Sequence, residues 1–251
     1  MSEKAECFRA LHETGCFLIP NAWDAGSAHL LAQLGFQAVA TTSAGLAFML
    51  ARTDGAGAVS RAEAIANAAD IAAATALPAS ADLEDGYGPA PEDVAATVGA
   101  AIEAGLVGCT IEDTTANPAA PHPFILTARA ENHLYGIADL DDTIHRLTAF
   151  AEAGADCLYA PALPTLDAIR KVVAAVAPKP VNVLIGPRDG TVPLEVLRDA
   201  GVRRVSVGGA IARAAYGQVL TIGQALAAGD IAGALRGVPG HAELNGRMRK
   251  P

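Results

Sequence analysis

The stretch EAGADCLYA, residues 152–160, carries the chain from the end of a helix into a buried strand through a single Ala-Gly turn. The same pattern returns in EAGLVGCTIE (103–112) and in DAGVRRVSV (199–207). Each copy has a glycine where a helix ends, followed by small and apolar residues typical of a strand that is covered on both faces. The repeat therefore predicts a fold of alternating helices and parallel strands.

Outward from these turns, short apolar runs alternate with helical patterns along the whole chain. We expect eight strands, at 16–20, 37–42, 78–83, 107–112, 124–129, 156–160, 181–185 and 202–207. Helices are expected at 24–34, 60–76, 91–104, 139–153, 165–176, 193–200 and 210–228. This order predicts an α/β fold, a (β/α)8 TIM barrel that residues 1–251 form as one domain. The alternative, an open doubly wound sheet, is disfavoured because no GxGxxG motif follows the first strand.

One connection breaks the pattern. Only DTTANPAAPHP (113–123) lies between the fourth and fifth strands, and its three prolines exclude a regular helix. A parallel crossover normally needs a dozen residues or more. We therefore expect that the barrel lacks the outer helix at this point, or that the sequence given omits it.

Composition and charge narrow the possible partners. The formal charge of −9 argues against nucleic acid, which needs a basic face, and leaves a small acidic substrate possible. No apolar run is long enough for a membrane helix, so no membrane partner is expected. The four cysteines are scattered without metal-type spacing, and we expect them to be reduced and mostly buried in a cytoplasmic protein.

Acidic side chains collect where two neighbouring strands end. SADLEDGYG (80–88) places Asp82 and Glu84 two positions apart, hence on one face of a strand, and Glu112 ends the next strand. In a barrel these side chains meet at the carboxyl-terminal mouth, where barrel enzymes carry out their chemistry. Carboxylates without histidine or cysteine neighbours suit a hard cation, so Mg²⁺ is expected and Mn²⁺ is possible.

Three further strands bring polar groups to the same mouth, namely Arg129, Tyr159 and Asn182. That five adjacent strands end in this way is the main functional signal in the sequence. Taken singly, each acidic residue could equally be a solvated side chain or a helix cap. A glycine pair in SVGGAIARAAYG (206–217) leaves two readings open as well: a helix start that receives an anion, or simply a tight turn.

Several segments together resemble the isocitrate lyase/phosphoenolpyruvate mutase superfamily. They are NAWDAGSAHLLAQLGFQAVATTSAGLA (21–47), SADLEDGYG (80–88), GCTIEDTT (108–115), LTARAEN (126–132) and AEAGADCLYAPAL (151–163). The resemblance implies a barrel whose last helix is swapped between subunits, in a homodimer or homotetramer. It also implies bound magnesium and a small carboxylic acid substrate, a 2-oxo or 2-hydroxy acid that passes through an enolate-like intermediate.

The resemblance extends to single residues around the metal. By position, Asp82, Glu84 and Glu112 match the magnesium carboxylates, several of which act through water in the family. Asp54, in ARTDG (51–55), matches another acidic residue near the metal. Glu112 is therefore expected to serve both the metal and catalysis.

Substrate contacts follow from the same resemblance. TTSAGLA (41–47) matches a loop that binds the substrate carboxylate through Ser43 and the backbone amides near Gly45 and Leu46. Arg129 matches the arginine that pairs with substrate, and Asn182 is a looser match. Tyr159, or a water molecule on the metal, is the candidate proton donor.

Departures from the family limit the expected reaction. The lyases carry a cysteine-containing KKCGH-type loop after the fourth strand, where this chain has TTANPAAPHPF (114–124). We expect a carbon–carbon lyase that cleaves or decarboxylates a small 2-oxo or 2-hydroxy (di)carboxylic acid, since decarboxylation needs the least acid–base machinery. The alternatives are a phosphonopyruvate-type mutase or hydrolase that acts on P–C bonds, and a non-catalytic, metal-dependent binder of 2-oxo acids.

Overall fold

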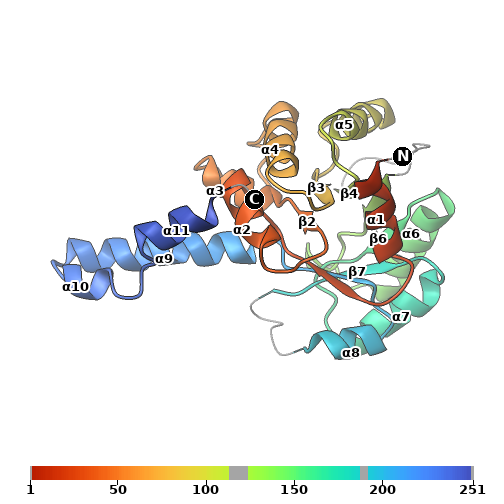
Figure 1. The fold of residues 1–251 in the computed structure, drawn as a ribbon. Helices are drawn as coiled ribbons and strands as arrows, with labels where there is room; N and C mark the ends of the chain where they lie inside the picture. Colours follow the sequence, from red (N-terminus) through yellow and green to blue (C-terminus); the bar gives the residue numbers. More distant parts are fainter. Residues whose placement is uncertain (1, 113–123, 187–191, 250–251) are drawn as a thin grey trace.

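The eight expected strands form one parallel sheet that curls into a nearly closed barrel (Figure 1). The computed structural model describes residues 2–112, 124–186 and 192–249. The ladders run in the order β1-β8-β7-β6-β5-β4-β3-β2. Between β1 and β2 the sheet is joined by two backbone hydrogen bonds, from Ala40 N to Pro20 O at 2.9 Å and from Ala22 N to Ala40 O at 2.7 Å. The prediction of a (β/α)8 barrel is thereby confirmed.

Every predicted strand is present, each a little shorter than its apolar run. The strands are β1 (Phe17–Ile19), β2 (Val39–Ala40), β3 (Ala79–Asp82), β4 (Gly108–Glu112), β5 (Ile125–Arg129), β6 (Cys157–Tyr159), β7 (Val181–Leu184) and β8 (Arg204–Ser206). The β4–β5 ladder is the longest of the pairings, from Gly108↔Ile125 to Glu112↔Arg129. The segment 113–123 that joins these two strands lies outside the described residues, and so does the expectation of a missing helix there.

All seven predicted helices are also present, most of them with caps that the sequence signals. They are α2 (Ala25–Ala32), α4 (Arg61–Ala73), α5 (Pro91–Glu103), α6 (Leu140–Glu152), α7 (Leu166–Val176), α8 (Leu194–Asp199) and α9 (Ala210–Ala227). Asp24 and Ser60 each close a capping box with the third residue of their helix. The described chain also contains four helices that were not predicted from the sequence: α1 (Glu3–Leu11), α3 (Ser43–Met49), α10 (Ile231–Ala234) and α11 (His241–Arg247).

Helix α1 covers the amino-terminal end of the barrel. Its Phe8 is fully buried in a cluster with residues at the starts of several strands, among them Phe17, Val107 and Ile125. Phe8, His12 and Phe17 pack edge to face, with ring centroids 4.8 to 6.3 Å apart. The floor of the barrel is therefore closed by aromatic side chains.

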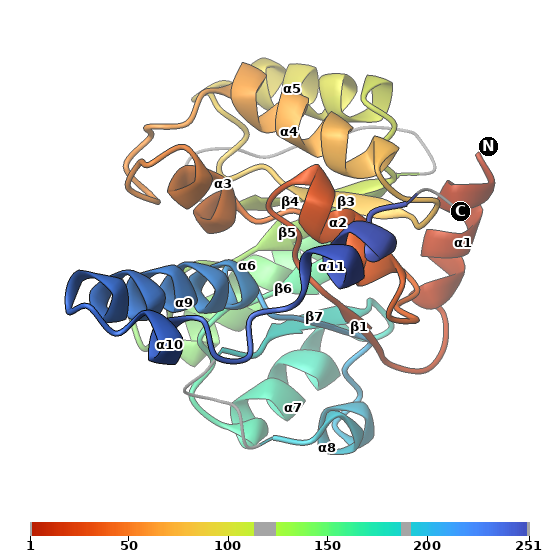
Figure 2. The same ribbon diagram turned by 60° about the vertical axis from the view of Figure 1, so that its left-hand side comes forward.

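The carboxyl-terminal helices form an arm that projects from the barrel (Figures 1 and 2). Helix α9 packs on α3 at its start and on α10 at its far end, and Ala212 is its one buried residue. The chain then returns to α11, where the Arg247 carbonyl contacts His29 Nε2 at 3.0 Å and accepts from Gln33 Nε2 at 2.6 Å. Large apolar side chains are exposed along this arm, namely Val219, Leu220, Leu226, Ile231, Leu235, Val238, Leu244 and Met248.

Two further expectations can be compared with the structure. Cys109 and Cys157 are buried, but Cys16 is half-buried and Cys7 is exposed, so the expectation of mostly buried cysteines holds for two of the four. No disulfide joins them. In the described part of the chain, no helix has both the length and the apolar character needed to cross a membrane.

Candidate active site

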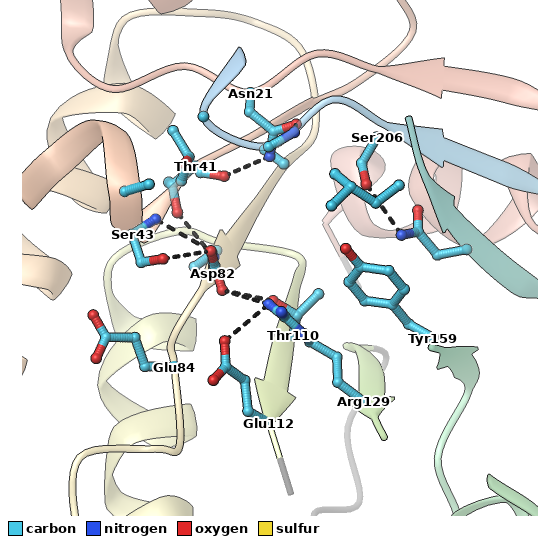
Figure 3. Close-up of a pocket in the computed structure, with 18 of the residues that line it drawn as sticks. Asn21, Thr41, Ser43, Asp82, Glu84, Thr110, Glu112, Arg129, Tyr159 and Ser206 are labelled. Carbon is cyan, nitrogen blue, oxygen red and sulfur yellow. Dashed lines mark hydrogen bonds and ion pairs between the residues drawn. The ribbon is translucent and has the colours of Figure 1, made fainter. Parts of the chain in front are cut away.

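A cavity of about 300 Å³ opens at the carboxyl-terminal ends of the strands. Parallel strands in a barrel end at one rim, so the side chains that follow them share this space. Figure 3 shows the polar residues directed into it from β2 to β8. The predicted site residues that line it are Ser43, Asp54, Asp82, Glu84, Glu112, Arg129, Tyr159 and Asn182.

Asp82, at the end of β3, is the residue with most polar contacts on the acidic side. Its Oδ2 accepts from both the backbone N–H of Ser43 (3.1 Å) and the Ser43 hydroxyl (3.0 Å). Its Oδ1 accepts from the Thr110 hydroxyl at 3.2 Å and from Arg129 Nη1 at 3.3 Å. The backbone N–H of Asp82 donates to Thr41 Oγ1 at 2.8 Å. Contacts from the start of α3, from β4 and from β5 thus fix the Asp82 carboxylate.

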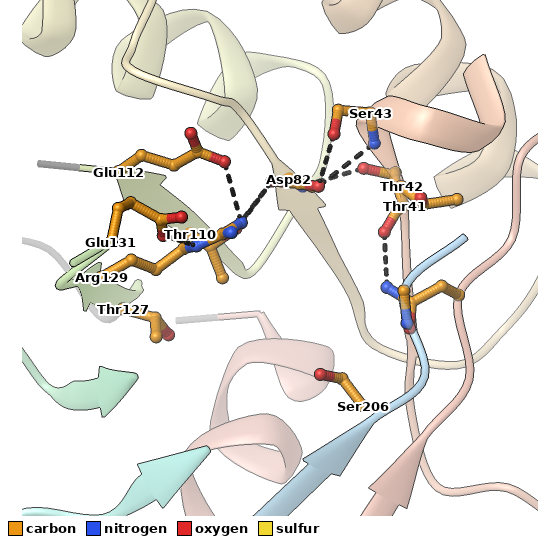
Figure 4. A network of polar contacts seen from close by, with 12 residues as sticks. Thr41, Thr42, Ser43, Asp82, Thr110, Glu112, Thr127, Arg129, Glu131 and Ser206 are labelled. Carbon is orange, nitrogen blue, oxygen red and sulfur yellow. Dashed lines mark hydrogen bonds and ion pairs between the residues drawn. The ribbon is translucent and has the colours of Figure 1, made fainter. Parts of the chain in front are cut away.

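Arg129, at the end of β5, lies among three carboxylates (Figure 4). Its Nη1 is 3.3 Å from Asp82 and 3.0 Å from Glu112, and its Nε is 2.7 Å from Glu131. The guanidinium also stacks on the Tyr159 ring, with Cζ 4.8 Å from the ring centroid. Only 9% of this side chain is exposed, so the charge pairs act in a partly desolvated environment where they are strong.

The acidic side of the cavity carries more negative charge than Arg129 can balance. Burial, together with the charges of Asp82, Asp54 and Asp85, raises the pKa of Glu84 to about 7. Burial also raises the pKa of Glu112; Arg129 opposes this shift, but Asp82 and Glu131 reinforce it. Carboxyl groups with raised pKa values that share one cavity are the environment that a bound cation stabilises.

These carboxylates do not close around one point. Both oxygens of Asp82 already accept hydrogen bonds, and Arg129 lies between Asp82 and Glu112. Among the described residues, no group of three or more His, Cys, Asp and Glu side chains is arranged to hold a metal ion directly. The geometry does not give Asp82, Glu84, Glu112 and Asp54 as one set of direct ligands. The donor set does suit a hard cation that keeps several of its waters.

Asp54 lies on the loop between α3 and α4 and reaches the cavity from above the strand ends. Arg52 Nη1 donates to the Ala58 carbonyl at 3.0 Å and to Glu63 Oε2 at 2.8 Å, which ties the two ends of the loop together. Burial and the charge of Asp82 raise the pKa of Asp54, while Arg129 and Arg213 lower it. The side chain is therefore within electrostatic range of groups on both sides of the cavity.

The expected carboxylate-binding loop is a helix start instead. Thr42 caps α3 by accepting from Gly45 N at 3.3 Å, and the Leu46 N–H donates to the Thr42 carbonyl at 3.0 Å. Ser43 and Ala44 line the cavity, whereas Gly45 and Leu46 are buried and do not. The assignment of substrate contacts to Gly45 and Leu46 is corrected accordingly, because their amides are used within the helix.

Tyr159 and Asn182 differ in how free they are to meet a ligand. Figure 3 shows the Tyr159 hydroxyl directed into the cavity, and burial raises the pKa of this group to about 12 although Arg129 lowers it. Asn182 has both ends of its amide engaged: Nδ2 donates to Ser206 Oγ at 3.1 Å, and Oδ1 accepts from Arg204 Nε at 2.9 Å. Tyr159 is thus placed to meet a ligand, whereas Asn182, its partner on the adjacent strand, is part of the hydrogen-bonded wall of the cavity.

Arg204 forms the polar floor of the cavity and was missed in the sequence. The residue is 3% exposed, and its partners are neutral: Asn182, the Thr127 hydroxyl at 3.0 Å from Nη2, and His12 Nε2 at 3.4 Å from Nη1. Alternation along VRRVSV would have turned Arg204 and Ser206 inward together. Glu131 and Thr110 were missed as well, although each lies two positions from a predicted residue on the same strand or its extension.

On the β8–α9 side, the cavity is formed by a tight turn and a helix start, and no described carboxylate lines it there. Asn21 Oδ1 accepts from Val207 N (3.1 Å) and Gly208 N (2.9 Å), which fixes the turn before α9. A Cβ on Gly209 would lie 3.1 Å from the Ala44 Cβ, so this glycine allows α9 to start close against α3. The turn brings Arg213, in the first turns of α9, to the cavity rim.

Comparisons with known proteins identify relatives of this chain. The model of the phosphoenolpyruvate phosphomutase family matches residues 8–121 and 114–227. A solved structure from Burkholderia cenocepacia J2315, a candidate lyase/mutase, is 44% identical with a TM-score of 0.91, covering 99% of this chain and 96% of that one.

Two relatives are similar over most of their length. An uncharacterized protein of Mycobacterium tuberculosis is 34% identical over 80% of this chain and 81% of its own. The probable 2-methylisocitrate lyase 2 of Corynebacterium glutamicum is 29% identical over 85% of this chain and 76% of its own. With the barrel and its acidic mouth, these matches show that the chain belongs to the phosphoenolpyruvate phosphomutase family, within the isocitrate lyase/phosphoenolpyruvate mutase superfamily of lyases and mutases.

Proposed function

We propose that the protein is a Mg²⁺-dependent carbon–carbon lyase that cleaves or decarboxylates a small 2-oxo or 2-hydroxy carboxylic acid. The observation that carries this proposal is the grouping of Asp54, Asp82, Glu84 and Glu112 around a cavity of about 300 Å³ that contains Arg129. This volume is at the small end of ligand sites, which supports a small metabolite as substrate.

The carboxylates of Asp82, Glu84, Glu112 and Asp54 would hold the ion, mostly through water, because the side chains do not converge on one point. Mn²⁺ could replace Mg²⁺ with the same ligands. A bound divalent ion would supply positive charge beside the oxygen that becomes an enolate when the substrate bond breaks.

The protein's own groups would position the substrate. Arg129 is held rigidly by its carboxylate partners and by the Tyr159 ring, so its remaining N–H groups are oriented before a ligand arrives. Ser43, at the start of α3, lies against Asp82 on the other side of the strand end. The Asp82 carboxylate bridges Ser43 and Arg129, so a substrate carboxylate would bind beside Asp82, against the remaining N–H groups of Arg129.

Tyr159 is the proposed proton donor. Its high pKa keeps the hydroxyl protonated at neutral pH, and the stacked Arg129 stabilises the phenolate if a proton leaves. Proton transfer from Tyr159 to the carbanion carbon would complete a decarboxylation, with CO₂ as the second product. A water molecule in the cavity is the alternative donor.

A substrate panel tests the proposal. Purified protein with Mg²⁺ is offered oxaloacetate, methylisocitrate and phosphonopyruvate, and pyruvate, glyoxylate, succinate and phosphate are measured. We expect pyruvate and CO₂ from oxaloacetate, or pyruvate and succinate from methylisocitrate, and loss of turnover when EDTA removes the metal. Inactivity with all three acids, with and without Mg²⁺, would reject the lyase function for these substrates.

The same panel separates the alternatives. Release of phosphate from phosphonopyruvate would identify P–C bond chemistry instead. Thermal stabilisation by these acids without any product would identify a binding protein, since a ligand that binds only the folded state raises the unfolding temperature.

We also propose that the protein is a homodimer or homotetramer in which the α9 arm packs on a second copy. Helix α9 has 18 residues, a length of about 27 Å, yet only Ala212 is buried within its own chain. The exposed Val219 and Leu220 give it an apolar side with no partner among the described residues. Swapping of this helix would cover that side on the partner's barrel.

Light scattering coupled to size-exclusion chromatography tests the assembly. We expect a dimer or tetramer for the native chain and a smaller species for the double variant Val219→Asp, Leu220→Asp. A monomer at micromolar concentration in the native protein would reject the swapped arrangement.

A further inference from the structure

The two sides of the cavity differ in charge. All four carboxylates that line it, from Asp54, Asp82, Glu84 and Glu112, lie on the β2–β4 side. The β7–α9 side is lined by Leu184, Ser206, Gly208, Gly209 and Arg213, and by no carboxylate of the described chain. A molecule that fills the cavity therefore meets an acidic side and a cationic side.

The three arginines of the cavity are paired very differently. Arg129 contacts three carboxylates, and Arg204 is enclosed by neutral partners in the floor. Arg213 is exposed at the rim, and its guanidinium makes no hydrogen bond or ion pair with the described residues. Arg213 is thus the cation of the cavity that has no partner within the described chain.

The backbone fixes where Arg213 is presented. Its N–H donates to the Gly209 carbonyl at 2.9 Å, so the residue belongs to the first turns of α9. The preceding turn is held by Asn21 and packed against Ala44, which keeps the helix start at the rim. From this helix start Arg213 lines the cavity, whose carboxylates come from the β2–β4 side.

We propose that Arg213 binds the second carboxylate of a dicarboxylic substrate and is a specificity-determining residue. This inference rests on the proposed function, in which the first carboxylate and the adjacent oxygen lie on the acidic side with Arg129 and Ser43. An acid with a methyl group in place of its second carboxylate leaves Arg213 without a partner. Selection for dicarboxylates then comes from one charge-assisted contact at the rim.

Matched pairs of acids test the inference. Malate and 2-hydroxybutanoate have the same chain length and differ in the second carboxylate, and neither needs to react for binding to be measured. Dissociation constants are measured by titration calorimetry with Mg²⁺ present, and KM is measured for the best substrate of the panel. We expect native protein to bind malate more tightly, and Arg213→Gln to weaken malate binding by about tenfold to a hundredfold, a range typical of hydrogen bonds to charged groups.

Two variants control the measurement. Arg213→Lys keeps the charge and should recover part of the malate affinity, whereas loss of packing alone would not be rescued. Arg170→Gln removes an exposed arginine on the outer helix α7 and should leave the affinity for malate unchanged. Circular dichroism and the unfolding temperature confirm that each variant is folded.

The outcomes separate this inference from the proposed function. Equal affinity of the native protein for the two acids, or an unchanged preference for malate in Arg213→Gln, would overturn the role of Arg213 while the lyase function stands. A native protein that neither binds these acids nor turns over any acid of the panel would reject both proposals.

Discussion

Arg129 and Arg204 are both buried inside the same barrel, one near the mouth and the other at the floor. The mouth surrounds Arg129 with Asp82, Glu112 and Glu131, so this region holds more negative than positive charge. The floor gives Arg204 only neutral partners, an amide, a hydroxyl and an imidazole. The mouth thus has more carboxylates than it has cations to pair them, as the proposed metal site requires, whereas the floor satisfies its hydrogen bonds internally.

The contrast has an energetic meaning. Carboxylates that repel one another are unfavourable for the folded state until a cation arrives, which is a common property of functional sites. Buried donors and acceptors that satisfy one another are favourable for folding and leave little for a ligand. Changes at the mouth should therefore affect activity, and changes at the floor should affect stability.

The largest effect is expected for Glu84→Gln at the mouth. The amide keeps the size of the side chain but removes a negative charge that would face the metal, so kcat/KM should fall by about a thousandfold. In metal-free protein with EDTA, the unfolding temperature should stay the same or rise, because repulsion among the carboxylates is relieved. Steady-state kinetics and calorimetry measure the two quantities.

A matched change on the outside of the barrel controls this experiment. Glu103→Gln, at the end of α5, removes a carboxylate away from the cavity and should leave both quantities unaltered. Native activity in Glu84→Gln would show that Glu84 has no role in the mechanism. It would also contradict the expectation that changes at the mouth affect activity.

The next effect is expected for Arg204→Met at the floor. Methionine fills part of the volume but leaves the Asn182 and Thr127 oxygens without their donor, so the free energy of unfolding should drop by about 3 kcal/mol. Urea denaturation measures this change. Arg203→Met is the control, because Arg203 lies next to it on the chain but donates to the Gly15 carbonyl at an exposed position. If Arg203→Met destabilised the protein as much as Arg204→Met, the buried hydrogen bonds of Arg204 would not be the cause of the loss.

The smallest effect concerns pH and His12, also in the floor. Burial and the nearby Arg204 together lower the pKa of His12 to about 3, although the bond of Nδ1 to the Phe8 carbonyl (2.8 Å) opposes this shift. The unfolded chain therefore takes up a proton that the folded chain excludes, and stability is lost as pH falls below about 6.5. At pH 5 the loss should be about 2 kcal/mol.

Comparison with His12→Gln isolates this contribution. Unfolding free energies are measured between pH 7.5 and 5, and the variant should lose stability less steeply than the native protein. His241→Gln, on the exposed helix α11, should retain the native slope. Identical slopes in His12→Gln and the native chain would show that His12 does not exclude a proton.

The fold could be predicted from the sequence because its signals are local. The Ala-Gly turns, the caps at Asp24 and Ser60 and the short apolar runs each specify one element, and a barrel is the arrangement that buries them all. The arm of α9 to α11 was predicted only in part, because its apolar side chains look like those of an ordinary outer helix.

The site was less predictable wherever the backbone leaves regular geometry. Alternation placed Asp82 and Glu84 on one face, but β3 ends at Asp82, and Glu84 has a φ of 47°, in the left-handed region. Both residues still line the cavity, although they and Glu112 are not arranged to hold one metal ion directly. The prediction that the amides of Gly45 and Leu46 contact the substrate was wrong for a similar reason, because Thr42 caps a helix where a loop was expected.

The aromatic plug under the barrel has a kinetic consequence. Since Phe8, His12 and Phe17 close the lower end, a ligand would enter and leave the cavity at its rim. If the proposed cleavage takes place in this cavity, the fragment nearer the rim should leave before the deeper one. Products should thus leave in a fixed order, and the last product to leave should be a competitive inhibitor with respect to substrate.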